Sequence, residues 1–423
     1  MKNTLQKIRT AFKDRSIRKK ILFTLGILLA FRLLAVIPIP GVDVSRLTAF
    51  LANNQFLGVL NLFSGGGLSN LSVIMLGVGP YVTSSIIMQV LTIMIPSLKS
   101  MYQEEGEAGR QKFTQISRII TVPLALIQGF GLLTLLTNQN VIPALSRMEF
   151  IVNLLIVAGG SMLLMWLGEL ITEYGIGNGV SLIIFGGIIA NFPSHIGQTL
   201  YAYTASDLPL YILFAVVGLV VIAGVVLVTE AERPIPVTYA KQMHGTKMSG
   251  GASTYIPLRL TQAGVIPIIF ALSILLFPQI FANFFMNSTH PILAKIAYAM
   301  NSFSQKGWLY GVVYFVLVFL FTYFYTAVTF DPESMSHNLQ KNGAFIPGVR
   351  PGPATAEYVS RVLTRITFIG ALFLGIIAVL PLVVKGLTGI TSVALGGTSL
   401  LIVVNVATDL LKKIDAQIGM REY

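Results

Sequence analysis

SGGGLSNLSVIMLGVGPYVTSSIIMQVLT, residues Ser64–Thr92, is an apolar segment that glycine and proline repeatedly interrupt. Three glycines stand together at positions 65–67, and a Gly77-Val78-Gly79-Pro80 break follows. Glycine frees the backbone and proline lacks an N–H donor, so this segment is not a plain lipid-facing helix. Irregular backbone at membrane depth survives only inside protein or beside a water-filled cavity. The stretch therefore predicts a segment that lines a path through a membrane.

Composition indicates an integral membrane protein. The chain has 423 residues, of which 54% are hydrophobic and 11% charged, and its mean hydropathy is +0.77. Soluble domains carry about 25% charged residues. The chain has no cysteine, which excludes disulfides and thiolate metal sites, and its four histidines show no ligand spacing. We therefore expect no metal and no other cofactor.

Ten apolar segments have close to the ~20 residues that a helix needs to cross the hydrocarbon core. They lie near 21–37, 75–95, 119–137, 151–171, 180–200, 208–229, 262–285, 308–330, 365–384 and 393–411. An even number of spans places both termini on one side. Of the 29 lysine and arginine residues, 23 fall on that side, so both termini are expected in the cytoplasm. The net charge of +12 then reflects topology rather than a nucleic-acid partner.

The chain divides into four parts: a basic tail at 1–20, two halves of five spans at 21–204 and 205–411, and a short tail at 412–423. An odd number of spans per half requires the halves to have opposite orientations. Gly77-x-x-Pro80 and Gly264-x-x-Pro267 each fall in the second span of a half. Paired breaks of this kind indicate a central site or pathway in inverted-repeat membrane proteins.

Three connecting segments are long. The cytoplasmic loops at about 230–260 and 331–364 exceed what topology requires, which is typical of functional loops. The external segment 38–71 contains an apolar piece, Phe56–Phe63, that is too short to span and ends at the glycines. This piece is either a surface helix or a re-entrant element that enters the bundle.

Few charges lie near the spans, namely Arg32, Glu169 and Asp409. A solute carrier or ion pump would place ionisable residues within its spans, because such residues are costly there and are kept for function. Arg32 lies within about two turns of the outer end of the first span, so we expect it to snorkel towards water. Charge distribution therefore favours a channel or transporter with few buried charges.

Two pairs of β-branched residues, Val82/Ile86 and Val180/Ile184, lie four residues apart next to glycine-rich stretches. Each pair occupies one face of a helix. Such pairs are either ordinary packing or a hydrophobic constriction that gates by excluding water.

Nine strings extend this interpretation. They are PIPG at 38–41, GPYVTSSIIMQVLT at 79–92, EEGEAGRQK at 104–112, GIGNGVSLIIFGGI at 175–188, IPVTYAK at 235–241, AGVIPIIFALSILLFP at 263–278, FTYFYTAV at 321–328, NGAFIPGVRPG at 342–352 and GGTSLLIVVNVATDLLKKIDAQ at 396–417. In this order and spacing the chain resembles the SecY family, the central subunit of the bacterial protein translocation channel. The resemblance covers nearly the whole chain.

The resemblance implies an all-α polytopic membrane protein. Its ten transmembrane helices would form two inverted, pseudo-symmetric halves of five, hinged between spans five and six, with a short re-entrant plug helix at about 55–70. The implied pore ring consists of Val82, Ile86, Val180, Ile184, Ile269 and Ile402. The implied plug residues are Phe56, Leu57, Leu60, Phe63, Gly65, Gly66 and Gly67. A lateral gate would separate spans two and three from seven and eight, at Ile87, Thr261 and Phe277.

The long cytoplasmic loops match the family's docking site for the ribosome and the motor ATPase SecA. Arg350 falls in the position associated with motor function, and Arg110, Arg233 and Lys241 are expected to support it. Guanidinium suits bidentate binding of carboxylate or phosphate. Further implied partners are SecE-like and SecG-like subunits, signal sequences, unfolded preproteins, YidC, SecDF and membrane lipid.

The predicted function is that of a non-enzymatic protein-conducting channel in the bacterial cytoplasmic membrane. It would pass unfolded preproteins across the membrane and release hydrophobic segments sideways into lipid. The chain has no G-x-x-x-x-G-K-[ST] loop, so energy would come from partners. Gln111, Pro234 and Asp331 depart from the family pattern and leave open an accessory translocon paralogue with a restricted substrate set. An inverted-repeat solute carrier would need charged residues at the middle of the membrane, and the spans of this sequence do not supply them. An intramembrane enzyme would need paired catalytic groups within the spans, and the sequence has none there.

Overall fold

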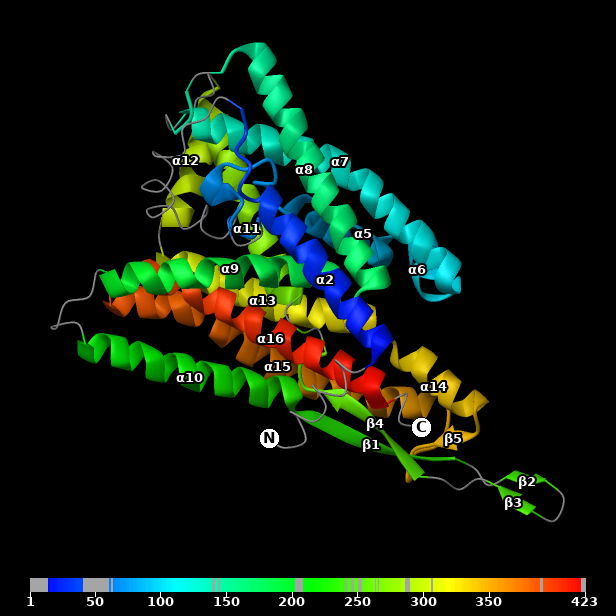
Figure 1. Cartoon of the computed structure of the whole chain (residues 1–423). Helices are drawn as coiled ribbons and strands as arrows, with labels where there is room; N and C mark the ends of the chain where they lie inside the picture. The colour runs from blue at the N-terminus through cyan, green and yellow to red at the C-terminus, as the bar shows by residue number, and fades with distance from the viewer. Residues whose placement is uncertain are drawn as a thin grey trace.

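The chain forms a mainly helical protein, shown in Figure 1 as long helices stacked side by side with a small sheet projecting from one end. The computed structural model describes residues 14–40, 61, 64–138, 141–143, 145–201, 208–239, 242–244, 247–249, 253–262, 264, 266–285, 290–305, 307–388 and 391–419.

Each of the ten predicted apolar segments coincides with a long helix. The helices are α2 (Arg15–Leu34), α5 (Gly79–Met94), α7 (Gly106–Asn138), α8 (Arg147–Tyr174), α9 (Gly179–Tyr201), α10 (Leu208–Glu230), α11 (Ile266–Phe285), α13 (Gly307–Thr329), α15 (Pro353–Thr388) and α16 (Thr391–Gly419). The shorter α6 (Pro96–Gln103), α12 (Pro291–Gln305) and α14 (Pro332–Lys341) connect them.

Several of these helices can cross a bilayer. In the described part of the chain, four segments are long and apolar enough: Gly106–Asn138, Arg147–Tyr174, Gly307–Lys341 and Pro353–Val384. Gly79–Met94 and Pro96–Tyr102, bent by 115°, make a fifth if they form one span. The count of ten spans stays a prediction, as does the division of the chain near residue 205, because residues 202–207 lie outside the described part.

The glycines that begin the two Gly-x-x-Pro motifs have similar backbone conformations. Gly77 and Gly264 have φ of 61° and 57°, a region that strains residues with a side chain. Pro80 and Pro267 each stand second in their helices, α5 and α11, where the missing proline N–H leaves no helical hydrogen bond unmade. Residues 75–78 form turns, so the second span begins at Gly79 rather than at residue 75. The sequence repeat is therefore also a structural repeat.

One hydrophobic core joins both halves. Buried residues from α2, α5, α8, α9, α11, α13, α15 and α16 form a single cluster, and α11 lies against α5, α7, α12 and α13. A second cluster holds Ile39 and Leu71 against α7 and α8. At one end of the bundle, Ile17, Ile176 and Ile418 pack together, which places the start of α2 beside the end of α16. The side of the membrane on which each terminus lies stays a prediction.

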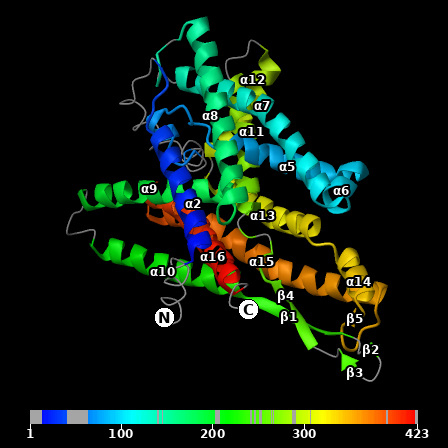
Figure 2. The same ribbon diagram turned by 45° about the vertical axis from the view of Figure 1, so that its right-hand side comes forward.

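The two long loops form one unit rather than two separate surfaces. β1 (Glu232–Tyr239) pairs antiparallel with β4 (Ser253–Arg259), in a register that sets Glu232 opposite Arg259. β5 (Ala344–Phe345), from the second loop, pairs with the other edge of β1. β2 (Gln242–His244) and β3 (Lys247–Ser249) form a small hairpin beyond them. Figure 2 shows α14 and the sheet at the same end of the molecule.

Candidate functional site

Six aliphatic side chains predicted to form a ring come together in the main core cluster. Val82 and Ile86 come from α5, Val180 and Ile184 from α9, Ile269 from α11 and Ile402 from α16. Five are buried, with Ile184 and Ile402 only 1% and 2% exposed, and Val180 is partly buried against the same cluster. Four helices distant in sequence therefore contribute one apolar cluster. Its role as a constriction stays a prediction.

Close contact between α8 and α9 positions two of these side chains. A Cβ on Gly179 would collide with the carbonyl oxygen of Gly168, so only glycine permits this approach. The Gly179 N–H donates to Thr172 Oγ1 at 2.9 Å. Asn178 Oδ1 accepts the N–H of Ser181 at 3.1 Å and caps the start of α9. These contacts fix the first turn of α9, and with it Val180.

The glycine triplet predicted to belong to the plug is buried between α2 and α9. Gly65 and Gly66 have φ of 61° and 88°. A Cβ on Gly65 would collide with the Phe31 ring, and one on Gly66 would collide with the Asn191 amide. The other predicted plug residues, Phe56, Leu57, Leu60 and Phe63, lie outside the described residues.

Hydrogen bonds hold the segment that follows the glycines. Asn61 Oδ1 accepts from the Ser69 N–H at 3.0 Å and from its hydroxyl at 2.9 Å. The Ile39 N–H donates to the Leu71 carbonyl at 2.8 Å, which joins this segment to the PIPG string. No sequence pattern predicts these bonds of Asn61, because its partners are backbone and hydroxyl groups in a non-repetitive turn. These hydrogen bonds therefore hold the residues on both sides of the three glycines in place.

The two sides of the predicted lateral gate are in contact, because α11 lies against both α5 and α7. Ser84 Oγ donates to the Ser117 carbonyl at 2.5 Å, which ties α5 to α7 on one side of this seam. Ile87 is partly buried on α5. Thr261 is buried, and its hydroxyl has no hydrogen-bond partner among the described residues. Phe277 lies on α11, but its side chain is outside the described set.

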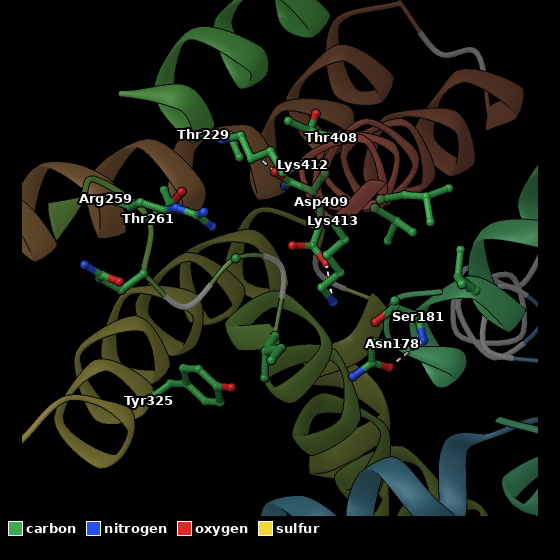
Figure 3. A pocket seen from close by; sticks show the side chains of 18 residues that line it. Asn178, Ser181, Thr229, Arg259, Thr261, Tyr325, Thr408, Asp409, Lys412 and Lys413 are labelled. Atoms are coloured by element: carbon green, nitrogen blue, oxygen red, sulfur yellow. Dashed lines mark hydrogen bonds and ion pairs between the residues drawn. The ribbon is translucent and has the colours of Figure 1, made fainter. Parts of the chain in front are cut away.

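A polar cavity of about 250 Å³ lies at the end of the bundle where α9 begins and α16 ends (Figure 3). Thr229 Oγ1 donates to Asn405 Oδ1 at 2.8 Å, and Asp409 pairs with Lys413 at 2.8 Å on its wall. Asn178, Ser181, Arg259 and Thr261 also line it. Sequence reasoning missed Thr229 and Asn405, because their bond joins residues 176 apart in the chain.

The cavity leads towards the aliphatic cluster. Ile266 and Val406 line the cavity, and each lies one helical turn from a predicted ring residue, Ile269 and Ile402. The polar cavity therefore lies beside the aliphatic cluster. A passage for water or a polypeptide from the cavity through the cluster stays a prediction.

Three of the four predicted docking cations lie in the described part of the chain, and all three are exposed. Arg233 is on β1 and Arg350 is on the loop before α15, both in the unit built from the two long loops. The Arg350 carbonyl accepts the Thr355 hydroxyl at 2.9 Å, which stiffens this loop. Arg110 is on α7, near α6. Lys241 lies outside the described residues.

One departure from the family pattern has a local structural role. Asp331 caps α14 and accepts the N–H groups of Glu333 at 3.0 Å and Ser334 at 3.4 Å. Partial burial acts to raise the pKa of Asp331, but the hydrogen bonds from Ser334 and Glu333 outweigh it and the pKa is lowered. The carboxylate is therefore stable as a cap at neutral pH.

Comparison with known proteins identifies the family. The family model described as SecY matches residues 72–411, which is well over half of the chain. This chain belongs to the SecY family. The protein translocase subunit SecY of Thermotoga maritima is 41% identical over 430 aligned residues, covering 99% of this chain and 96% of that protein. The protein translocase subunit SecY of Thermus thermophilus is 41% identical, with 98% and 95% covered.

Solved structures share the SecY fold. A protein-conducting channel superposes with a TM-score of 0.64 at 17% identity, covering 96% of this chain and 93% of that one. Sec61 from a canine ribosome–channel complex superposes with a TM-score of 0.60 at 16% identity, over the same shares of the two chains. At these identities the likeness establishes the fold. The predicted family and the polytopic helical fold class are confirmed.

Proposed function

We propose that this chain is the channel subunit of a bacterial protein translocase, which passes unfolded preproteins across the cytoplasmic membrane. The convergence of Val82, Ile86, Val180, Ile184, Ile269 and Ile402 from four helices carries the proposal. The relatives that match nearly the whole chain are protein translocase subunits, which supports it.

The aliphatic ring suits a channel for polypeptides. An ion that enters it loses hydration and finds no polar partner, which costs several kcal/mol or more. An extended polypeptide presents side chains that aliphatic groups can surround, and its passage separates the ring residues without breaking any hydrogen bond between them. The polar cavity beside the ring offers Asn178, Ser181 and Thr261 to the arriving chain. The site therefore discriminates by hydration rather than by a specific binding group.

Lateral release would take place where α11 meets α5 and α7. A hydrophobic signal segment that enters this seam exchanges protein contacts for contacts with lipid. Such a segment opens the seam only if it binds the open state better than the closed state. Segment hydrophobicity therefore sets both the opening of the gate and the choice between lipid and the far side of the membrane.

The sheet and α14 form the surface on which we place the cytoplasmic partners, the ribosome and SecA. Arg233 and Arg350 are exposed on this unit, where guanidinium groups can bind carboxylate or phosphate. The likeness to Sec61 from a ribosome–channel complex supports the ribosome as a partner. SecE-like and SecG-like subunits would cover the exposed apolar flanks of the bundle, with YidC and SecDF as further partners.

The test is reconstitution. The chain is purified in mild detergent with its SecE-like and SecG-like partners and placed in proteoliposomes with SecA, ATP and a preprotein. Protease-protected preprotein is the expected result. A folded complex that protects no preprotein while it transports a small solute would overturn the proposal in favour of a carrier.

A further inference from the structure

Arg32 is partly buried on α2 and contacts a neighbouring helix. The sequence predicts that it snorkels to the membrane surface, but in the structure its Nη2 donates to Asn191 Oδ1 on α9 at 3.4 Å. Its Nη1 is buried and has no hydrogen-bond partner among the described residues. An arginine in a largely apolar bundle is costly and marks a functional position. Its snorkelling to the membrane surface stays a prediction, and the sequence did not predict its partner on α9, 159 residues away.

Asn191 has a second contact, with the buried glycine turn. A Cβ on Gly66 would collide with the Asn191 amide, so the amide lies directly against the Gly66 backbone. Four residues earlier on α9, a Cβ on Gly187 would collide with Gly65. Residues four apart share one helix face, so Gly187 and Asn191 together support the turn.

These residues form a cradle made of Phe31, Arg32, Gly187 and Asn191, which receives Gly65 and Gly66. The cradle accepts only glycine at both positions, because each has a positive φ and no room for a Cβ. Arg32 bonds to the Asn191 amide, whose atoms also face Gly66. The cradle is therefore built from two helices that a hydrogen bond from a charged group joins at 3.4 Å.

We propose that the Arg32–Asn191 pair is a catch that holds the Gly65–Gly66 turn in place and keeps the resting channel sealed. Both are positioning residues that act through the turn. The inference rests on the proposed function as a channel and adds the residues that set how firmly its seal is closed. A single hydrogen bond of 3.4 Å is weak enough to break when a substrate opens the channel.

The test uses the reconstituted complex and measures resting chloride flux without preprotein. Asn191→Ala is expected to raise this flux about ten-fold, equivalent to roughly 1.4 kcal/mol, which is near the lower end for a hydrogen bond to a charged group. Arg32→Met is expected to raise this flux as well, because Asn191 loses the same hydrogen bond. When Arg32→Met is already present, Asn191→Ala is expected to raise the resting chloride flux by less than about a further three-fold, because the hydrogen bond between the two residues is already lost. Arg18→Met, an exposed arginine on the same helix, is the matched control.

A second substitution, expected to strengthen the contact with Arg32, separates the effect of this contact from a general loss of folding. Asn191→Asp gives Arg32 a carboxylate partner, so we expect unchanged or lower resting flux and several-fold weaker translocation of preproteins with weak signals. Native flux in Asn191→Ala, or an undiminished effect of Asn191→Ala in the Arg32→Met background, would overturn the catch. If the native complex itself translocates no preprotein, the proposed function fails instead, so the two failures are distinguishable.

Discussion

Replacing Ile402 with asparagine tests the aliphatic ring most sharply. Ile402 is 2% exposed and belongs to the core cluster that also holds residues of α5, α9 and α11. Burying an amide without a partner costs about 1–3 kcal/mol on protein scales, and losing the isoleucine removes about 1.5–3 kcal/mol of apolar burial. Part of both costs also applies to the open state, where it does not change the balance between the closed and open states. We therefore take about 2 kcal/mol as the destabilisation of the closed ring relative to the open one. This predicts a rise in resting ion flux of roughly thirty-fold.

The assay compares single-channel conductance of the reconstituted native, Ile402→Asn and Leu411→Asn complexes. Leu411 is on the same helix but 52% exposed, so its replacement changes polarity without entering the ring. Export of a preprotein with a defective signal should also increase for Ile402→Asn, because a hydrated ring opens with less help from the substrate. If Ile402→Asn and Leu411→Asn show the same flux as the native complex, the ring does not form the barrier.

The remaining predictions concern docking, packing and capping. Arg350→Glu should reduce SecA-driven translocation at least ten-fold without lowering the yield of folded complex, and normal SecA-driven transport would remove this residue from the docking surface. Gly179→Ala should lower the melting temperature of the complex, because its Cβ meets the Gly168 carbonyl, whereas Gly159→Ala, with open space around it, should not. Asp331→Ala should cost about 1 kcal/mol of stability in the α14 unit and Asp331→Asn much less at pH 7. Folding lowers the pKa of Asp331, so its carboxylate contributes fully to the free energy of unfolding above about pH 4. This contribution is lost as the pH falls through the pKa of the folded state. Acid denaturation at the same pH in the native and Asp331→Asn proteins would contradict this.

Much of the architecture could be predicted because apolar length is a strong signal for helices in membranes. All ten apolar segments became helices, and both Gly-x-x-Pro motifs became the same left-handed break. The ring residues were reached through family resemblance, while their helical spacing alone could not separate a constriction from ordinary packing.

The remaining features depend on contacts between distant parts of the chain. β5 is only two residues long, so no sequence pattern in 331–364 predicts that it pairs with β1 of the loop at about 230–260. The environment of Arg32 depends on Asn191, and the cavity wall depends on the Thr229–Asn405 bond. Hydropathy places a residue along a span, but it does not identify which other helix will face it.

The central claim is that a polypeptide passes through the ring of six aliphatic residues. The native chain has no cysteine, so a single cysteine at Ile402 or Leu411 gives a clean cross-linking site. A preprotein with one cysteine is stalled during translocation and oxidised. The account predicts a disulfide adduct with Ile402→Cys and none with Leu411→Cys. An adduct at Leu411→Cys without one at Ile402→Cys would contradict it.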